Sequence, residues 1–212
     1  MQQRPYDAVI FDLLTALLDS WTLWNDVAGS DAAGLKWRKA YLDLTYDAGA
    51  YRAYEGIIRE AASGAGIAPE TAEMLMVRWP DLRPWPEADS VLGVLRRRGV
   101  KLGIATNSSN ALAKHALAAA NSFDAKPFDA VATAESAGYY KPRPEPYRLA
   151  LDRLGTDPAR TLFVAGSAAD VPGATAVGMP VYWHNRAGLS AVGDVQPMRT
   201  ESSLTPLFEL VL

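Results

Sequence analysis

Brief apolar runs alternate with longer amphipathic segments through most of this chain, and that alternation leaves few folds open. The runs have the length and the aliphatic character of strands buried on both faces, and they lie at residues 8–11, 101–105, 161–165, 180–183 and, less distinctly, 128–133. Helical patterns separate them, at residues 90–98, 110–120, 144–154 and 170–177. This order predicts an α/β fold, a doubly wound, Rossmann-like parallel sheet with helices on both faces.

Residues 19–85 interrupt the alternation. They contain no clear strand pattern, they carry five of the six tryptophans, and residues 38–62 have a mostly helical pattern rich in tyrosine. Prolines at 80, 84 and 86 mark the return to the strand–helix rhythm. We therefore predict a small helical cap domain at 19–85, inserted after the first strand into a core domain made of residues 1–18 and 86–212.

Composition excludes several classes of site and partner. The formal net charge of −3 gives no basic surface for nucleic acid, and a chain without cysteine has no disulfide or thiolate metal site. No stretch reaches the roughly 18 apolar residues of a membrane helix, and the N-terminal residues do not read as a secretory signal. We expect a cytoplasmic protein that binds a small molecule; its oligomeric state stays open, a homodimer being one option.

Polar side chains follow the predicted strands where each one ends. Asp12 follows the run at 8–11, and Thr106 and Asn107 follow the run at 101–105. Lys141 lies in the loop after residues 128–133, and Asp170 comes soon after the run at 161–165. The carboxyl ends of parallel strands share one edge of a sheet, where ligands of such folds bind. We expect these groups to converge there.

Each of these residues also has an ordinary structural interpretation. Asp12 could cap a turn, Asn107 and its neighbouring serines could cap the next helix, and Asp170 suits a helix start. Lys141, which precedes a proline, would by itself be taken as a surface lysine. The functional interpretation rests on the set, because the members are far apart in sequence and meet only in the predicted fold.

Four segments resemble, in order, the motifs of the haloacid dehalogenase superfamily: FDLLTALLD, GIATNSS, YYKPRPEPY and FVAGSAADVPGA. The resemblance covers nearly the whole chain. It implies that Asp12 attacks the substrate, that Thr106 and Lys141 orient the site and balance its charge, and that Asp170 belongs to the acidic fourth motif.

Two positions separate the branches of that superfamily. Its phosphatases carry a second aspartate two residues after the nucleophile, where this chain has Leu14, and usually another where it has Gly166. Both changes weaken a Mg²⁺ site, because Mg²⁺ needs oxygen ligands. The chain is closer to the L-2-haloacid dehalogenase branch, which needs no metal. We therefore expect no metal and no cofactor.

The dehalogenase branch supplies a set of expected substrate-binding residues. Trp37-Arg38-Lys39 is similar to its cap segment, in which the arginine binds the anionic part of the substrate or the leaving halide. The resemblance adds four further candidates: Asn107, Leu14, Tyr147 and Ser167. An ion pair between Arg38 and a neighbouring acid such as Asp43 is the plainer alternative for the arginine.

The chain also departs from that branch. A threonine usually stands four residues after the nucleophile, but here that position is Ala16 and Thr15 comes one place early. The serine and asparagine of the fourth motif are replaced by Ala165 and Ser167. Three polar groups of the expected site are thus lost or shortened.

These observations predict a hydrolase that acts through a covalent aspartyl ester, with a small anionic 2-haloacid as substrate. Asp12 attacks the carbon that carries the leaving group, and Asp170 with Lys141 positions the water that hydrolyses the ester. Two alternatives remain: a Mg²⁺-dependent phosphatase of the same superfamily, which Leu14 disfavours, and a binding protein that has lost catalysis, which Ala16 and Ala165 favour.

Overall fold

A single sheet of six parallel strands forms the centre of the molecule, seen in a computed structural model that describes residues 4–120 and 128–212. The strand order is β3-β2-β1-β4-β5-β6. The strands are β1 (Ala8–Phe11), β2 (Lys101–Thr106), β3 (Ala130–Thr133), β4 (Thr161–Ala165), β5 (Val181–His184) and β6 (Arg199–Glu201). The predicted α/β sheet is confirmed. Residues 1–3 and 121–127 of the predicted core domain lie outside the described residues.

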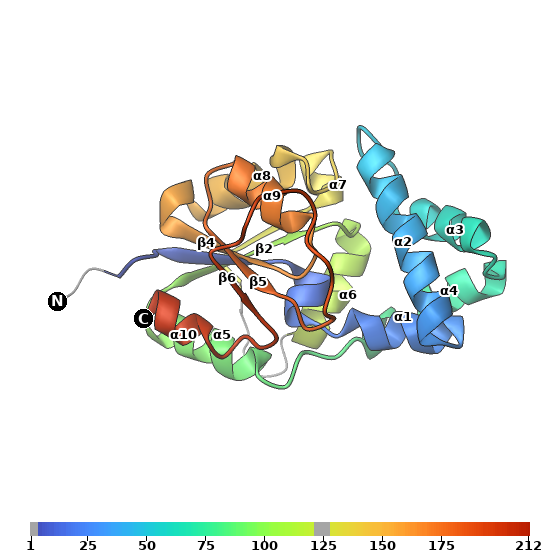
Figure 1. The fold of residues 1–212 in the computed structure, drawn as a ribbon, viewed down its shortest axis with the longest axis horizontal. Coiled ribbons are helices and arrows are strands. Elements are labelled where there is room, and N and C mark those ends of the chain that lie inside the picture. The colour runs from blue at the N-terminus through green and yellow to red at the C-terminus, as the bar shows by residue number, and fades with distance from the viewer. Residues whose placement is uncertain (1–3, 121–127) are drawn as a thin grey trace.

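Alternation along β1 distributes its side chains to the two faces of the sheet. Val9 and Phe11 pack into the core under α5 (Ala88–Arg97), whereas Ile10 packs with α8 (Pro144–Leu154) on the opposite face. Figure 1 shows α8 and α9 (Asp170–Ala176) on one side of the sheet and α5 with α10 (Leu207–Val211) on the other. All four residues of β1 are fully buried, as a strand covered by helices on both faces requires.

The remaining core elements are short or lie at the ends of strands. They are η1 (Leu13–Leu17), α6 (Asn110–Ala120), α7 (Ala134–Ala137) and η3 (Pro158–Arg160). Strand β6 was not predicted, because its three residues are polar and only partly buried at the edge of the sheet. The predicted strand at 128–133 begins two residues later, at Ala130.

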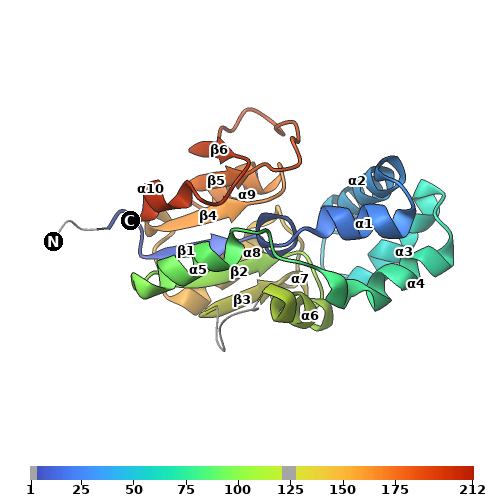
Figure 2. The ribbon, with the colours of Figure 1, turned by 90° about the horizontal axis from the view of Figure 1, so that it is seen from below.

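A lobe of helices lies beyond the carboxyl ends of the strands (Figure 2). We call residues 20–81 the helical lobe; it comprises α1 (Ser20–Ala28), α2 (Asp31–Asp47), α3 (Tyr54–Ala65), α4 (Pro69–Val77) and η2 (Trp79–Asp81). Residues 38–62, for which a mostly helical pattern was predicted, belong to two separate helices. The chain turns between α2 and α3 at Gly49, whose φ is +64°. The chain enters and leaves the lobe side by side, where Leu18 pairs with Pro84.

Aromatic side chains form the core of the helical lobe. The ring of Trp24 lies 4.8 Å from Trp37 and 5.6 Å from Tyr41, and Tyr54 links Tyr41 to Trp79 at 5.5 and 6.1 Å. These spacings are those of favourable aromatic pairs. The packing gives a structural reason for most of the lobe's tryptophans. None of the helices in the described parts of the chain is long and apolar enough to cross a bilayer.

Candidate active site

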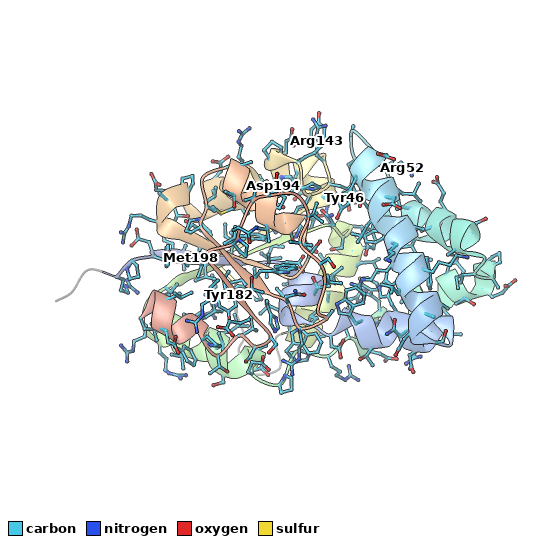
Figure 3. The ribbon with its side chains drawn as sticks, viewed as in Figure 1. Tyr46, Arg52, Arg143, Tyr182, Asp194 and Met198 are labelled. Atoms are coloured by element: carbon cyan, nitrogen blue, oxygen red, sulfur yellow. The ribbon has the colours of Figure 1, made fainter. Side chains whose placement is uncertain are left out.

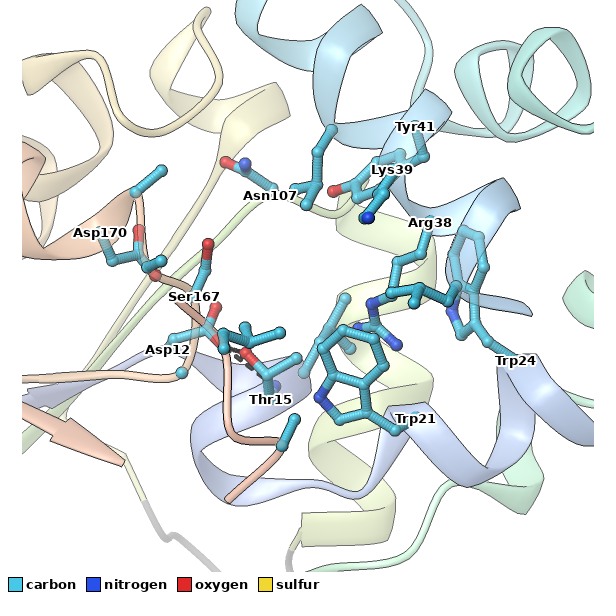
Figure 4. Close-up of a pocket in the computed structure, with 18 of the residues that line it drawn as sticks. Asp12, Thr15, Trp21, Trp24, Arg38, Lys39, Tyr41, Asn107, Ser167 and Asp170 are labelled. Carbon is cyan, nitrogen blue, oxygen red and sulfur yellow. Dashed lines mark hydrogen bonds between the residues drawn. The ribbon is translucent and has the colours of Figure 1, made fainter. Parts of the chain in front are cut away.

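A cavity of about 780 Å³ lies between the carboxyl ends of the strands and the helical lobe. Figure 4 shows Asp12, Thr15, Ser167 and Asp170 on the sheet side of this cavity, facing Arg38, Lys39 and Trp21 of the lobe. The cavity therefore combines residues of several chain segments, as expected for a ligand site at the carboxyl edge of a parallel sheet.

Asp12 is placed by the turn that follows β1. Its backbone N–H donates to the Val164 carbonyl of β4 at 2.9 Å, so the residue still belongs to the sheet edge. Its Oδ2 accepts hydrogen bonds from the Thr15 N–H at 2.9 Å, the Thr15 hydroxyl at 2.6 Å and the Ala16 N–H at 3.2 Å. The side chain of Asp12 thus caps η1, and its carboxylate has a fixed orientation at the cavity.

Lys141 lies between two carboxylates. Its ammonium donates to Asp12 Oδ1 at 2.8 Å and to Asp170 Oδ2 at 2.9 Å, and the Tyr147 hydroxyl donates to Asp170 Oδ1 at 2.7 Å. All four side chains are buried. Residues from four places in the sequence therefore form one continuous chain of charge-assisted hydrogen bonds, which fixes the position of each member.

These contacts set the charges of the site. Burial alone would raise the pKa of the Asp12 carboxyl, but the charge of Lys141 and the hydrogen bonds from Lys141 and Thr15 outweigh it, so that pKa lies below its usual value. Burial would lower the pKa of Lys141, yet its two carboxylate neighbours raise it. Burial raises the pKa of Asp170, and Asp12 adds to the increase. Asp12 is consequently a carboxylate beside a persistent ammonium.

Arg38 reaches the cavity from α2. Its side chain is only 6% exposed, and its Nη2 donates to the Ser20 hydroxyl at 2.6 Å. The guanidinium lies 4.0 Å from the centre of the Trp21 ring, and its Nη1 is buried with no hydrogen-bond partner among the described residues. The alternative ion pair with Asp43 is not formed. A buried cation with an unsatisfied donor beside a cavity suits an anionic ligand.

Three predicted site residues hydrogen-bond to neighbouring protein groups, and of these only Asn107 lines the cavity. Asn107 accepts from the Lys141 N–H at 2.6 Å and donates to the Lys141 carbonyl at 3.1 Å, so its amide clamps the backbone of the lysine. Thr106 is fully buried, its hydroxyl 3.4 Å from that of Ser108, and it does not line the cavity. Tyr147 lies behind Asp170, also away from the cavity.

Leu14 and Ser167 both line the cavity, as predicted for substrate-binding residues. Tyr46 lines the same cavity, and burial is the largest cause that raises the pKa of its hydroxyl to about 12. Tyr46 projects from the C-terminal part of α2 on the side that faces the core (Figure 3). The core and the helical lobe therefore each contribute a hydroxyl to the cavity lining, from Ser167 and from Tyr46.

Gly166 lies directly against η1. A Cβ at this position would overlap the Thr15 hydroxyl and the backbone nitrogen of Ala16. An aspartate there, as in the superfamily's phosphatases, would displace the turn that holds Asp12. Across the described ranges, no three His, Asp or Glu side chains converge on a common point as metal ligands. A carboxylate side chain at position 166 therefore does not fit beside this turn.

Comparison with known proteins places the chain in a family. A model of the haloacid dehalogenase-like hydrolases matches residues 6–178. The chain belongs to this family. The hydrolase is 29% identical to (S)-2-haloacid dehalogenase 1 of Pseudomonas sp. (strain CBS-3), over 98% of its own length and 97% of the relative's. It is also 30% identical to the phosphoglycolate phosphatase of Rhodospirillum rubrum, over 88% and 84% of the two chains.

The fold of the hydrolase is also similar, over nearly its full length, to solved structures. A crystal structure of an L-2-haloacid dehalogenase superposes with a TM-score of 0.84 at 26% identity, covering 96% of this chain and 97% of the other. The L-2-haloacid dehalogenase from Xanthobacter autotrophicus superposes with a TM-score of 0.82 at 22% identity, covering 97% and 98%. The similarity includes both the sheet and the helical lobe, because it extends over nearly the full length.

Sequence reasoning missed three residues of the site of this hydrolase. Thr15 was treated as a threonine out of place, although its hydroxyl contacts Asp12. Trp21, which packs on the Arg38 guanidinium, was noted only as one of the five tryptophans of residues 19–85. Tyr46 had no signal beyond a tyrosine-rich helix. A threonine at three residues after an aspartate is a recognisable side-chain cap, so the first could have been found.

Proposed function

We propose that this hydrolase removes the halogen from a small 2-haloacid by way of an aspartyl ester. The observation that carries the proposal is the hydrogen-bonded row of Asp12, Lys141 and Asp170 at the cavity, with the unsatisfied guanidinium of Arg38 on the opposite side. The first group supplies an ionised nucleophile, and the second supplies a binding site for an anion.

The first step would be a displacement at carbon. The Asp12 carboxylate forms a bond to the carbon that carries the halogen, and the halide leaves with the bonding electrons. Asp12 is ionised for this step, because the charge and the hydrogen bond of Lys141 lower the pKa of its carboxyl. Water then attacks the ester, which releases a 2-hydroxy acid and restores the carboxylate.

Substrate recognition would depend on Arg38. Its Nη1 is the natural donor for the substrate carboxylate or the departing halide, since the other contacts of the guanidinium, with Ser20 and Trp21, leave that nitrogen unpaired. Leu14 would contact the apolar part of the substrate in the cavity. Asn107 would act indirectly, by holding the backbone of Lys141.

We further propose that residues 19–85 act as a cap domain over the core of residues 1–18 and 86–212. The proposal is supported by the antiparallel contact of Leu18 with Pro84 at the joint and by the cavity that residues of both parts line, among them Tyr46 and Ser167. A lobe in this place keeps bulk water from the ester and strengthens the charge interactions of the site. Location in the cytoplasm and assembly as a homodimer stay predictions.

The phosphatase alternative predicts a different activity with the same nucleophile. One relative is named a phosphoglycolate phosphatase, but Leu14 and Gly166 replace the two carboxylates that the resemblance requires for that chemistry. A side chain at position 166 would overlap η1, so the packing of this turn requires the glycine. We therefore give dehalogenation precedence.

A parallel screen tests the proposal. Purified protein is incubated with short (S)- and (R)-2-haloacids and with a panel of phosphate monoesters, each with EDTA or with Mg²⁺, and halide and phosphate release are measured. We expect halide release that EDTA does not affect, and no phosphate release above an Asp12→Asn control. Phosphate release that depends on Mg²⁺, without halide release, would replace the proposal by the phosphatase; neither product would favour the binding protein.

A further inference from the structure

The two oxygens of the Asp12 carboxylate have different surroundings. Oδ2 accepts three hydrogen bonds, from the N–H and hydroxyl of Thr15 and from the N–H of Ala16, at 2.9, 2.6 and 3.2 Å. Among the described residues, Oδ1 accepts one hydrogen bond, from Lys141 at 2.8 Å. Because each carboxylate oxygen has two lone pairs, Oδ2 is saturated whereas Oδ1 keeps a lone pair that can reach a substrate.

We infer that Oδ1 is the attacking oxygen and that Oδ2, held by Thr15 and Ala16, takes up the negative charge when water attacks the ester. Thr15 is then a catalytic residue of the second step, at a position where the family resemblance does not place one. The inference rests on the proposed function, and it assigns separate roles to two atoms of one side chain.

The reaction balances with the residues present. After displacement, the substrate carbon is bonded to Oδ1 and the ester carbonyl is Cγ–Oδ2. Water attacks Cγ and gives a proton to Asp170, and the electron pair of the carbonyl moves onto Oδ2. When that pair returns, the Cγ–Oδ1 bond breaks, and Lys141 protonates Oδ1, which leaves in the 2-hydroxy acid. Lys141 recovers a proton from Asp170 across their 2.9 Å hydrogen bond.

The water oxygen stays on Cγ as the new oxygen of Asp12. The remaining proton leaves for solvent, because the pKa of this carboxyl is lowered. One water and one 2-haloacid thus give one 2-hydroxy acid, one halide and one proton.

Local structure explains how Thr15 reaches Oδ2 from one position earlier than the family's threonine. The turn after Asp12 is wide, since the N–H of Leu18 donates to the carbonyl of Leu13 five residues back, at 3.0 Å. The indole N–H of Trp85 donates to the Thr15 carbonyl at 3.0 Å and holds the backbone of the turn. Gly166 leaves the space that the Thr15 hydroxyl occupies.

Three variants separate the two chemical steps. Thr15→Val removes the hydroxyl at nearly constant volume, and Thr15→Ser restores it. Thr22→Val is the matched control. Thr22 also donates to an aspartate three residues before it, with its hydroxyl to Asp19 Oδ2 at 2.7 Å and its N–H to Oδ1 at 3.0 Å, and neither residue lines the cavity. Thr15→Ala serves if the valine variant does not fold, as judged by circular dichroism.

The experiment follows one turnover of (S)-2-chloropropionate by rapid quench, with halide and 2-hydroxy acid measured separately and the protein weighed by mass spectrometry. In Thr15→Val we expect a burst of about one halide per site, hydrolysis slowed roughly 100- to 1000-fold, and protein that carries the ester mass. Thr15→Ser should recover most of the hydrolysis rate, and Thr22→Val should match wild type.

Each other outcome is decisive. If Thr15→Val slows halide release and hydrolysis equally, or slows neither, Oδ2 is not the oxygen that is stabilised in the second step and the inference fails, while dehalogenation stands. If wild-type protein releases no halide from any haloacid of the screen, the proposed function fails and the inference fails with it.

Discussion

Replacing Arg38 by methionine removes a guanidinium placed to bind an anion in the cavity while keeping an apolar stem beside Trp21 and Trp24. A charge-assisted hydrogen bond in a buried site contributes about 1.5–3 kcal/mol. At about 1.4 kcal/mol per factor of ten, we expect kcat/KM for a 2-haloacid to fall about 10- to 100-fold. The kinetic parameter that changes identifies the role of Arg38: lost substrate binding raises KM, whereas lost halide stabilisation lowers kcat.

Stability should change little in the same variant. Methionine loses the hydrogen bond to Ser20 and the contact of the cation with the Trp21 ring, together roughly 2–5 kcal/mol. It also relieves the burial of a charge with an unpaired Nη1, a penalty of several kcal/mol. Because these contributions oppose each other, we expect the midpoint of thermal unfolding to stay within about 4 °C of wild type.

Arg59→Met is the matched control on the same lobe. Arg59 pairs with Glu73 on the surface, and half of its side chain is exposed, so its removal should leave kcat/KM unchanged. An Arg38→Met enzyme with wild-type kcat/KM would refute the argument, as would an equal loss in Arg59→Met. The assay is steady-state halide release over a range of substrate concentrations, beside a thermal melt of each variant.

Four further outcomes are expected. Asp12→Asn should lower halide release at least about a thousandfold with the circular dichroism spectrum unchanged, and activity that persists without deamidation would contradict a covalent role. Activity should survive dialysis against EDTA, and a large gain on adding Mg²⁺ would contradict the metal-free mechanism. Gly166→Ala should destabilise the fold by roughly 1–3 kcal/mol in urea unfolding, because its Cβ would overlap η1, whereas Gly56→Ala, where a Cβ meets open space within a helix, should stabilise by about 0.5–1 kcal/mol; equal effects would refute the packing argument. The pKa of Lys141 is raised above 10.5, so its ammonium persists as pH rises and kcat/KM should show no alkaline decline below about pH 10. On the acid side, the pKa of Asp170 is raised above 3.8 and that of Asp12 is lowered below it. The decline of kcat/KM should therefore begin above pH 3.8, where Asp170 takes up a proton while Asp12 is still ionised.

The architecture and the charged centre of the site could be predicted from residues alone. Strands buried on both faces require apolar runs, and this requirement is local, so β1 and β4 were located at the right residues. Asp12 and Lys141 are separated by 129 positions, yet the rule that ligands meet at the carboxyl edge of a parallel sheet brings them together without coordinates. The edge strand β6 was missed because polar residues at an edge carry no such pattern.

The tertiary structure decided which polar group of each segment faces the cavity. Thr106 and Tyr147 match the family's motifs but lie outside the cavity lining, and the amide of Asn107, which does line it, hydrogen-bonds to the Lys141 backbone. Thr15 and not residue 16 supplies the hydroxyl beside Asp12, because the width of η1 rotates that position toward Oδ2. Sequence patterns record the periodicity of elements, whereas the direction of one side chain depends on contacts between segments that are distant in the chain, and only folding brings those segments together.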